Sequence, residues 1–199
     1  MLGCNSPEKS NFMMEGENMR KWIVGGAVVV MTLAVAFSAI SNAEAQQRQR
    51  PSPPAKAECK FSDGKAINVD YSSPRMRGRK IYGDLVPFGK EWRTGANAAT
   101  KFVTTADLTI AGKAIPAGDY TLYTVPEQGK WTLVVSKKTG QWGIPYPGAG
   151  EDLLRADMKV SSLSAPLEEF TISFAQSGNT CTMNLDWEAT RATAAFARK

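Results

Sequence analysis

A short run of polar residues at positions 92–97, WRTGAN, holds the side chains best suited to chemistry. Arg93 offers a guanidinium, Thr94 a hydroxyl and Asn97 an amide, and a glycine between them permits a tight turn. In such a turn these groups and the backbone N–H groups can converge on one carboxylate, phosphate or set of sugar hydroxyls. The structural alternative is that Arg93 pairs with an acid and packs along Trp92, while Asn97 bonds the turn backbone.

Further candidates lie around this turn, in a segment of residues 73–100 that has no helical or strand period, and in a second loop of residues 141–150. Two more arginines add charge from the first segment, and tryptophans in each loop offer aromatic faces. The apolar side chains of Tyr82, Leu85, Val86 and Phe88 are expected to plug the end of the fold rather than line a pocket. The full set of ligand-binding candidates is Arg75, Arg79, Trp92, Arg93, Thr94, Asn97 and Trp142.

The chain contains no histidine. This excludes the Ser-His-Asp and Cys-His arrangements and removes the commonest zinc ligand, so we expect neither a metal nor another cofactor. Paired carboxylates remain an alternative, because glycoside hydrolysis needs only two acids at a suitable separation. Asp84 and Glu91 would be that pair, with Trp92 as a stacking face for a sugar ring.

The first 45 residues have the pattern of an export signal. Residues 1–18 read as a mis-called or disordered extension, because Met19 directly precedes a basic pair that begins the signal of residues 19–45. A basic start, an apolar run and a small-x-small motif predict cleavage after Ala45. The alternative is that residues 22–43 stay in the bilayer as an anchor. Either way, a periplasmic, secreted or inner-membrane-anchored protein is predicted.

Two cysteines, Cys59 and Cys181, remain after that cleavage. An even pair in an oxidising compartment predicts a disulfide that joins the start of the domain to a strand near its end, with two buried thiols as the alternative. The net charge of +5 favours anionic surfaces in a general way, and we infer no nucleic acid from it.

The rest of the chain is divided into short strands by turns. Residues 46–58 are polar and Pro-rich, which is typical of a disordered linker. From residue 59 to 199, apolar residues alternate with polar ones in runs of about six residues. Strands are expected at residues 66–72, 101–105, 107–110, 120–125, 131–136, 153–160, 170–174, 181–187 and 191–197. This pattern predicts one all-β domain, an antiparallel two-sheet sandwich of jelly-roll or immunoglobulin-like type, with a closed barrel as the alternative.

The motif PRMRGRKIYGDLVPFGKEWRTGANAAT, followed by AGKAIPAGDYTLYTVP, Trp131 and the QWG of residues 141–143, resembles a bacterial family catalogued as a domain of unknown function, DUF2911. The resemblance covers residues 66–197 and implies an exported, mainly β domain without an established activity or ligand. Where the family pattern often has an acid after the Asn of the GAN turn, this chain has Ala98.

Three functions are compatible with these features. The leading hypothesis is a non-catalytic exported domain that binds a small anionic or saccharide ligand, or a protein partner, through residues 73–100 and 141–150. The alternatives are a hydrolase that uses Asp84 and Glu91, and a structural envelope protein. A membrane is expected as a partner only if the N-terminal apolar segment is retained.

Overall fold

The computed structural model describes residues 51–199 of the 199-residue chain. The predicted extension, the signal or anchor, and residues 46–50 of the predicted linker lie outside the described residues. Among residues 51–199, no helix is long and apolar enough to cross a membrane.

The described chain is built from nine antiparallel strands, as the alternating sequence pattern predicts. A single short 3-10 turn, η1 (Ala149–Glu151), precedes the longest strand. The strands are β1 (Pro54–Lys60), β2 (Ala66–Ser72), β3 (Thr100–Thr104), β4 (Leu108–Ile110), β5 (Lys113–Ile115), β6 (Gly118–Pro126), β7 (Trp131–Ser136), β8 (Asp152–Ser177) and β9 (Thr180–Arg198).

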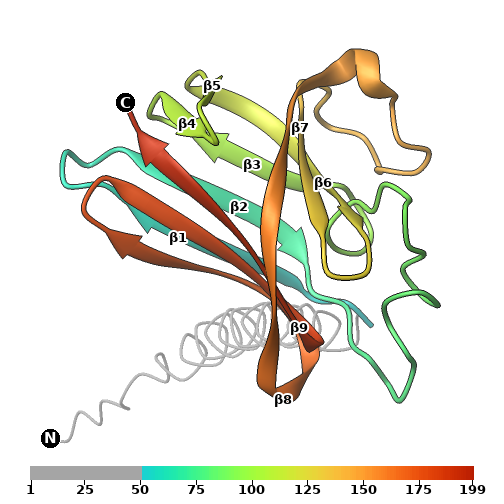
Figure 1. Ribbon diagram of the computed structural model, residues 1–199. Helices are drawn as coiled ribbons and strands as arrows, with labels where there is room; N and C mark the ends of the chain where they lie inside the picture. Colours follow the sequence, from blue (N-terminus) through green and yellow to red (C-terminus); the bar gives the residue numbers. More distant parts are fainter. Residues whose placement is uncertain (1–50) are drawn as a thin grey trace, which may run out of the picture. The chain divides into compact units, whose positions relative to one another are not determined.

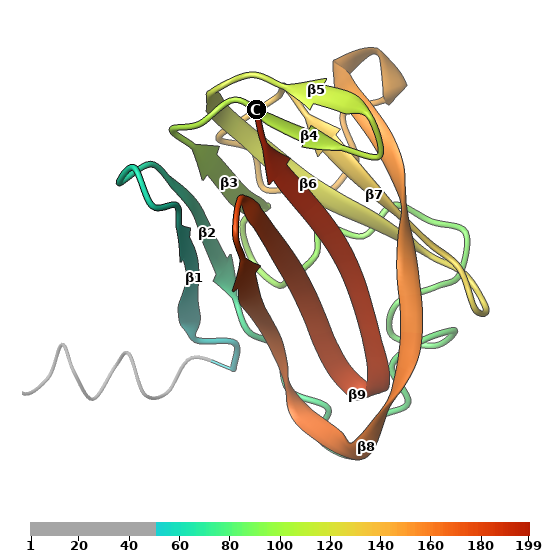
Figure 2. The same ribbon diagram turned by 60° about the vertical axis from the view of Figure 1, so that its left-hand side comes forward.

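Hydrogen bonds connect these strands in the order β1-β2-β3-β6-β7-β8-β9-β4-β5. β8 is long enough to belong to both layers: its first residues pair with β7, and from Lys159 onward it pairs with β9. The strands therefore form two layers, with β8 passing from one to the other (Figures 1 and 2). The predicted antiparallel all-β fold is confirmed, and its two layers belong to one nine-stranded sheet. Because β1 and β5 are edge strands, the sheet of residues 51–199 is open and is not the closed barrel.

The core lies between the two layers. Ile67 and Val69 of β2, Leu133 of β7 and Leu185 of β9 are almost fully buried, and each belongs to an alternating run in the sequence. Burying an apolar side chain of this size stabilises the fold by about 1.5–3 kcal/mol, so the alternation is a strong constraint on strand register.

The predicted disulfide is confirmed. Cys59 of β1 and Cys181 of β9 are bonded, and both side chains are buried in the core. The bond ties β1, at one edge of the first layer, to the far part of the β8–β9 hairpin, near the turn at Gly178.

The expected linker of residues 46–58 is too long, because β1 already begins at Pro54. Every residue of this strand pairs with β2, from Pro54 opposite Ser72 to Lys60 opposite Ala66. A proline is tolerated at the first position of an edge strand because its missing N–H faces no partner there. The segment does alternate, with Lys56 exposed, but its inward residues are mostly alanines.

Two other local expectations also change. Residues 181–187 and 191–197 form the single strand β9 rather than two strands. Glu188, at φ 52°, pairs with Leu167 of β8 between two irregularities in the register, and the strand continues through it. In the segment of residues 73–100, Tyr82 and Val86 are buried as expected, but Leu85 and Phe88 are 42% and 38% exposed and do not plug the fold.

Candidate ligand-binding site

The segment that carries Arg93 precedes β3 in the chain and, like β3, lies beside β6. Trp92 exchanges two backbone hydrogen bonds with Thr124 of β6, at N···O distances of 2.8 and 2.9 Å. Its partly buried ring packs against the core, stacked on Trp187 with centroids 5.9 Å apart and edge-on to Phe170 at 5.0 Å. The indole N–H donates to the Gly95 carbonyl at 3.1 Å. Trp92 is therefore part of the core's aromatic cluster.

Because neighbours on an extended chain point to opposite faces, Glu91 and Arg93 lie on the outer face of the sheet, the face of β3, β6 and β7 that points away from the core. Tyr123 of β6 also lies on this face. It is fully buried, yet it is not among the residues that make up the core, because the loop of residues 137–151 covers it. The outer face thus has a second buried layer at this point.

A strained turn holds Arg93 in place. Thr94 is fully buried at φ 55°, a conformation that costs a β-branched residue about 1–3 kcal/mol. The hydroxyl of Thr100 donates to the Thr94 carbonyl at 2.8 Å, and the Thr94 hydroxyl is 3.3 Å from that of Thr124. A Cβ at Gly95 would lie 3.0 Å from the Thr100 hydroxyl and 3.1 Å from the Ser72 carbonyl. Thr94 and Gly95 are therefore held in place by close contacts with their neighbours.

The aliphatic stem of Arg93 packs beneath the loop of residues 137–151. A Cβ at Gly143 would lie 3.0 Å from Arg93 Cβ and 2.9 Å from Ala99 Cβ, so the loop backbone is in close contact with both residues. Gly143 also has φ 90°, which side chains rarely adopt. The N–H of Ala99 donates to the Gln141 carbonyl at 3.3 Å and ties the loop to the turn.

The guanidinium of Arg93 has fewer partners than its burial demands. Its Nε is buried without a hydrogen-bond acceptor, and none of the ion pairs within residues 51–199 involves it. Burial lowers the pKa of Arg93, and the nearby Tyr123 opposes this shift. The predicted pairing with an acid is therefore not seen in the described part of the chain.

The Gln141 side chain contacts Tyr123, which is also close to Arg93, and uses only one half of its amide. Its Nε2 donates to the Tyr123 hydroxyl at 2.9 Å, while its Oε1 is buried without a donor. Burial raises the pKa of Tyr123, whereas the hydrogen bond from Gln141 and the charge of Arg93 lower it. The site therefore presents an unmatched donor on Arg93 and an unmatched acceptor on Gln141.

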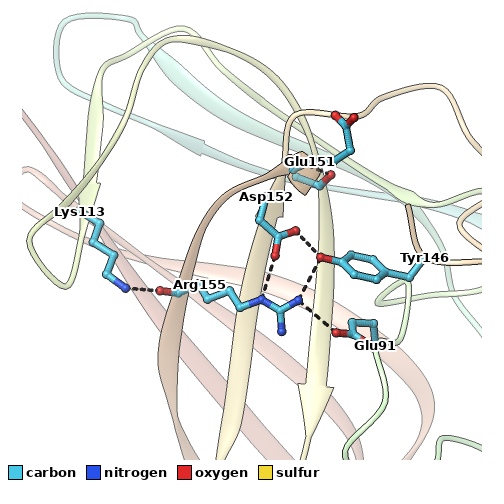
Figure 3. Close-up of polar contacts among 7 residues, drawn as sticks. Glu91, Lys113, Tyr146, Glu151, Asp152 and Arg155 are labelled. Atoms are coloured by element: carbon cyan, nitrogen blue, oxygen red, sulfur yellow. Dashed lines mark hydrogen bonds and ion pairs between the residues drawn. The ribbon is translucent and has the colours of Figure 1, made fainter. Parts of the chain in front are cut away.

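A closed ion network borders the site (Figure 3). Arg155 of β8 donates to Asp152 at 2.8 Å, to Glu91 at 3.1 Å and to the Tyr146 hydroxyl at 3.0 Å, and Tyr146 in turn donates to Asp152. Burial disfavours the charge of Arg155, but these bonds outweigh it and raise its pKa. Burial and the bond to Asp152 raise the pKa of Tyr146 to about 12. Every charge here has a partner, so the network positions the loop.

The remaining candidates have structural contacts of their own. Arg75 pairs with Glu169, and Arg79 donates to the backbone carbonyls of Met76 and Arg75. Asn97 donates to the Ser52 carbonyl at 3.2 Å and so holds the start of the domain rather than its own turn.

Trp142 is 63% exposed on the covering loop, as its place between glycines and prolines predicts. Of the ligand-binding candidates, Arg93 carries one of the two unmatched groups of the site, and Trp142 directly follows Gln141, which carries the other.

The two proposed catalytic acids form ion pairs with different basic side chains. Asp84 is exposed and 3.5 Å from Lys80, whereas Glu91 bonds Arg155. The acid that shares a cation with Glu91 is Asp152, from the far end of the covering loop. A hydrolase that uses Asp84 and Glu91 stays a prediction that these contacts do not favour.

Sequence reasoning missed Tyr123 and Gln141. The available signal was the run TLYTV in β6, which is apolar on both faces and indicates a strand covered on both sides.

Comparison with known proteins identifies the family. The sequence profile of DUF2911, described as a protein of unknown function, matches residues 52–196. No curated protein and no solved structure matches significantly. The profile covers both loops of the site, the first eight strands and all but the last two residues of β9, and so the chain belongs to the DUF2911 family.

Proposed function

We propose that this protein is an exported, non-catalytic binding domain whose ligand is a small anion held between Arg93 and the loop of residues 137–151. The observation that carries the proposal is the buried Nε of Arg93, which has neither an acceptor nor a paired acid among residues 51–199. A carboxylate or phosphate would supply that acceptor, with the two-point geometry that guanidinium groups favour.

The neighbouring groups narrow the class of anion. The unmatched Oε1 of Gln141 accepts a hydrogen bond, so the ligand needs a hydroxyl or amine donor beside its charge. Trp142 presents an exposed ring that a sugar or other flat apolar surface can contact. Hydroxy acids, sugar acids and sugar phosphates combine these properties.

A thermal-shift screen tests this proposal. Purified protein is heated with members of those three classes and with matched neutral sugars. A ligand raises the melting temperature of the wild type, and the shift is lost in Arg93→Met and kept in Arg79→Gln, which removes an exposed arginine that contacts only nearby backbone. If neutral sugars stabilise both variants as well as the wild type, or if no anion of these classes stabilises the wild type, the proposal fails.

A further inference from the structure

The two loops of the site carry most of the protein's surplus charge. Residues 73–100 and 137–151 contain eight lysines and arginines against three carboxylates, and the whole chain has a net charge of +5. Arg77, Arg79, Lys90 and Lys137 of these loops are exposed. The positive charge is therefore concentrated on one part of the domain rather than spread over it.

Large apolar side chains are exposed on the same two loops. Trp142 is 63% and Ile144 67% exposed, and Leu85 and Phe88 are 42% and 38% exposed. The two loops touch through Arg93, Ala99, Gln141 and Gly143, and they lie on one side of the fold in Figure 1. Basic side chains around exposed tryptophan and aliphatic residues are typical of surfaces that lie in the headgroup region of a bilayer.

The chain enters the domain on this same side. The Ser52 carbonyl accepts from Asn97, the Pro51 carbonyl from Arg77 at 3.4 Å, and the Pro53 carbonyl from the N–H of Ser73. The described chain therefore begins beside these loops.

We infer that the loops of residues 73–100 and 137–151 form a membrane-docking surface, with Trp142 and Ile144 in the interface of an anionic phospholipid bilayer and Arg77 and its basic neighbours on lipid phosphates. This surface is independent of the small anion proposed for Arg93, because it depends on exposed side chains and not on the buried guanidinium. The opposite end of β1 and β2, where residues 61–65 turn, points away from the lipid.

Tryptophan quenching by lipid tests the orientation. The full chain is reconstituted in unilamellar vesicles that contain phosphatidylglycerol, with or without lipids brominated near the headgroup, and its emission is compared with that of Trp142→Gln. Bromolipid removes an emission component in the wild type that is missing in Trp142→Gln, while Trp22 and the core tryptophans contribute equally to both. A matched control, Ser62→Trp in the Trp142→Gln chain, places the indole at the far turn and is not quenched further.

Charge is tested with one pair of variants. Because each surface lysine or arginine contributes about 1 kcal/mol to binding anionic lipid, Arg77→Gln lowers the ratio of docked to undocked domain roughly five-fold, while Lys65→Gln at the far turn leaves it unchanged. Equal quenching of wild type and Trp142→Gln overturns the inference, as does quenching of the Ser62→Trp control, or docking that is the same on phosphatidylcholine alone. In those cases the loops serve a soluble partner. Loss of anion binding in Arg93→Met does not change the outcome.

Discussion

Replacing Arg93 by Met distinguishes a binding role of this arginine from a structural one, because the two roles predict changes of opposite sign in the free energy of unfolding. The Met side chain keeps the aliphatic stem that packs beneath Gly143 and removes the guanidinium. A buried donor without a partner costs about 1–3 kcal/mol, and Arg93 Nε is such a donor. Removing this donor should therefore stabilise the fold, and part of the stabilisation is offset because the outer nitrogens of the guanidinium lose their contact with water. We therefore expect the free energy of unfolding to rise by about 1 kcal/mol, and the melting temperature by about 2–4 °C.

Urea unfolding at pH 7, followed by tryptophan emission, measures this change. Arg155→Met is the matched control, because Arg155 also lies on the outer face but donates to Glu91, Asp152 and Tyr146. Its loss leaves two acids without their cation, and we expect it to lower the free energy of unfolding by about 2 kcal/mol. If Arg93→Met destabilises the protein as much as Arg155→Met does, the guanidinium is a structural element and the reasoning that leads to the binding site is refuted.

Three other changes give further tests. Removing the disulfide with Cys59→Ala and Cys181→Ala, which lie 122 residues apart, lowers the free energy of unfolding by at most about 5 kcal/mol, and an intact-mass shift on reduction checks that the bond forms. Tyr146→Phe lowers the free energy of unfolding by about 1 kcal/mol at pH 8. Because the pKa of Tyr146 in the folded protein, about 12, lies above the usual value of 10, the wild type loses this extra stability as the pH rises from 10 to 12. If the difference in stability between the two proteins stays the same across this range, the hydrogen bond of Tyr146 is contradicted. Gly143→Ala lowers stability by about 2 kcal/mol and speeds proteolysis of the covering loop, whereas Gly150→Ala, which meets nothing within 4 Å, leaves both unchanged.

Periodicity predicted most of the fold because core burial leaves a direct trace in sequence. The alternation of Phe170, Ile172, Cys181 and Met183 predicts the β8–β9 hairpin, and these side chains on both of its strands are buried as expected. The length of β8 was not predictable in this way. Its middle, residues 163–169, faces solvent on both sides and looks like a loop, yet the strand continues through two irregularities in its pairing with β9.

Edge position explains the missed first strand. β1 is held by its backbone pairing with β2 and by one cystine rather than by large apolar side chains, so its composition is indistinguishable from that of a linker. Local composition reports what a segment buries, and an edge strand of alanines and lysines buries little.

The candidate site was predictable in part. The turn of residues 92–97 does fix an arginine, but the orientation of each side chain depends on the pairing of Trp92 with Thr124, which lies 32 residues further along the chain. That pairing turns Trp92 into the core and Arg93 out of it. The approach of Gln141 depends on a loop that leaves β7 and returns to β8, and no local pattern in the sequence encodes where such a loop lies.

The bond between Cys59 and Cys181 has a consequence for the order of events in the cell. It closes a covalent ring that contains almost the whole domain, with the far part of the β8–β9 hairpin fixed to the first strand. A chain that crosses a membrane as an extended thread cannot already contain such a ring, so in an exported protein the bond must form after passage. Domain made in a reducing cytosol would lack this closure, and its two cysteines would be thiols.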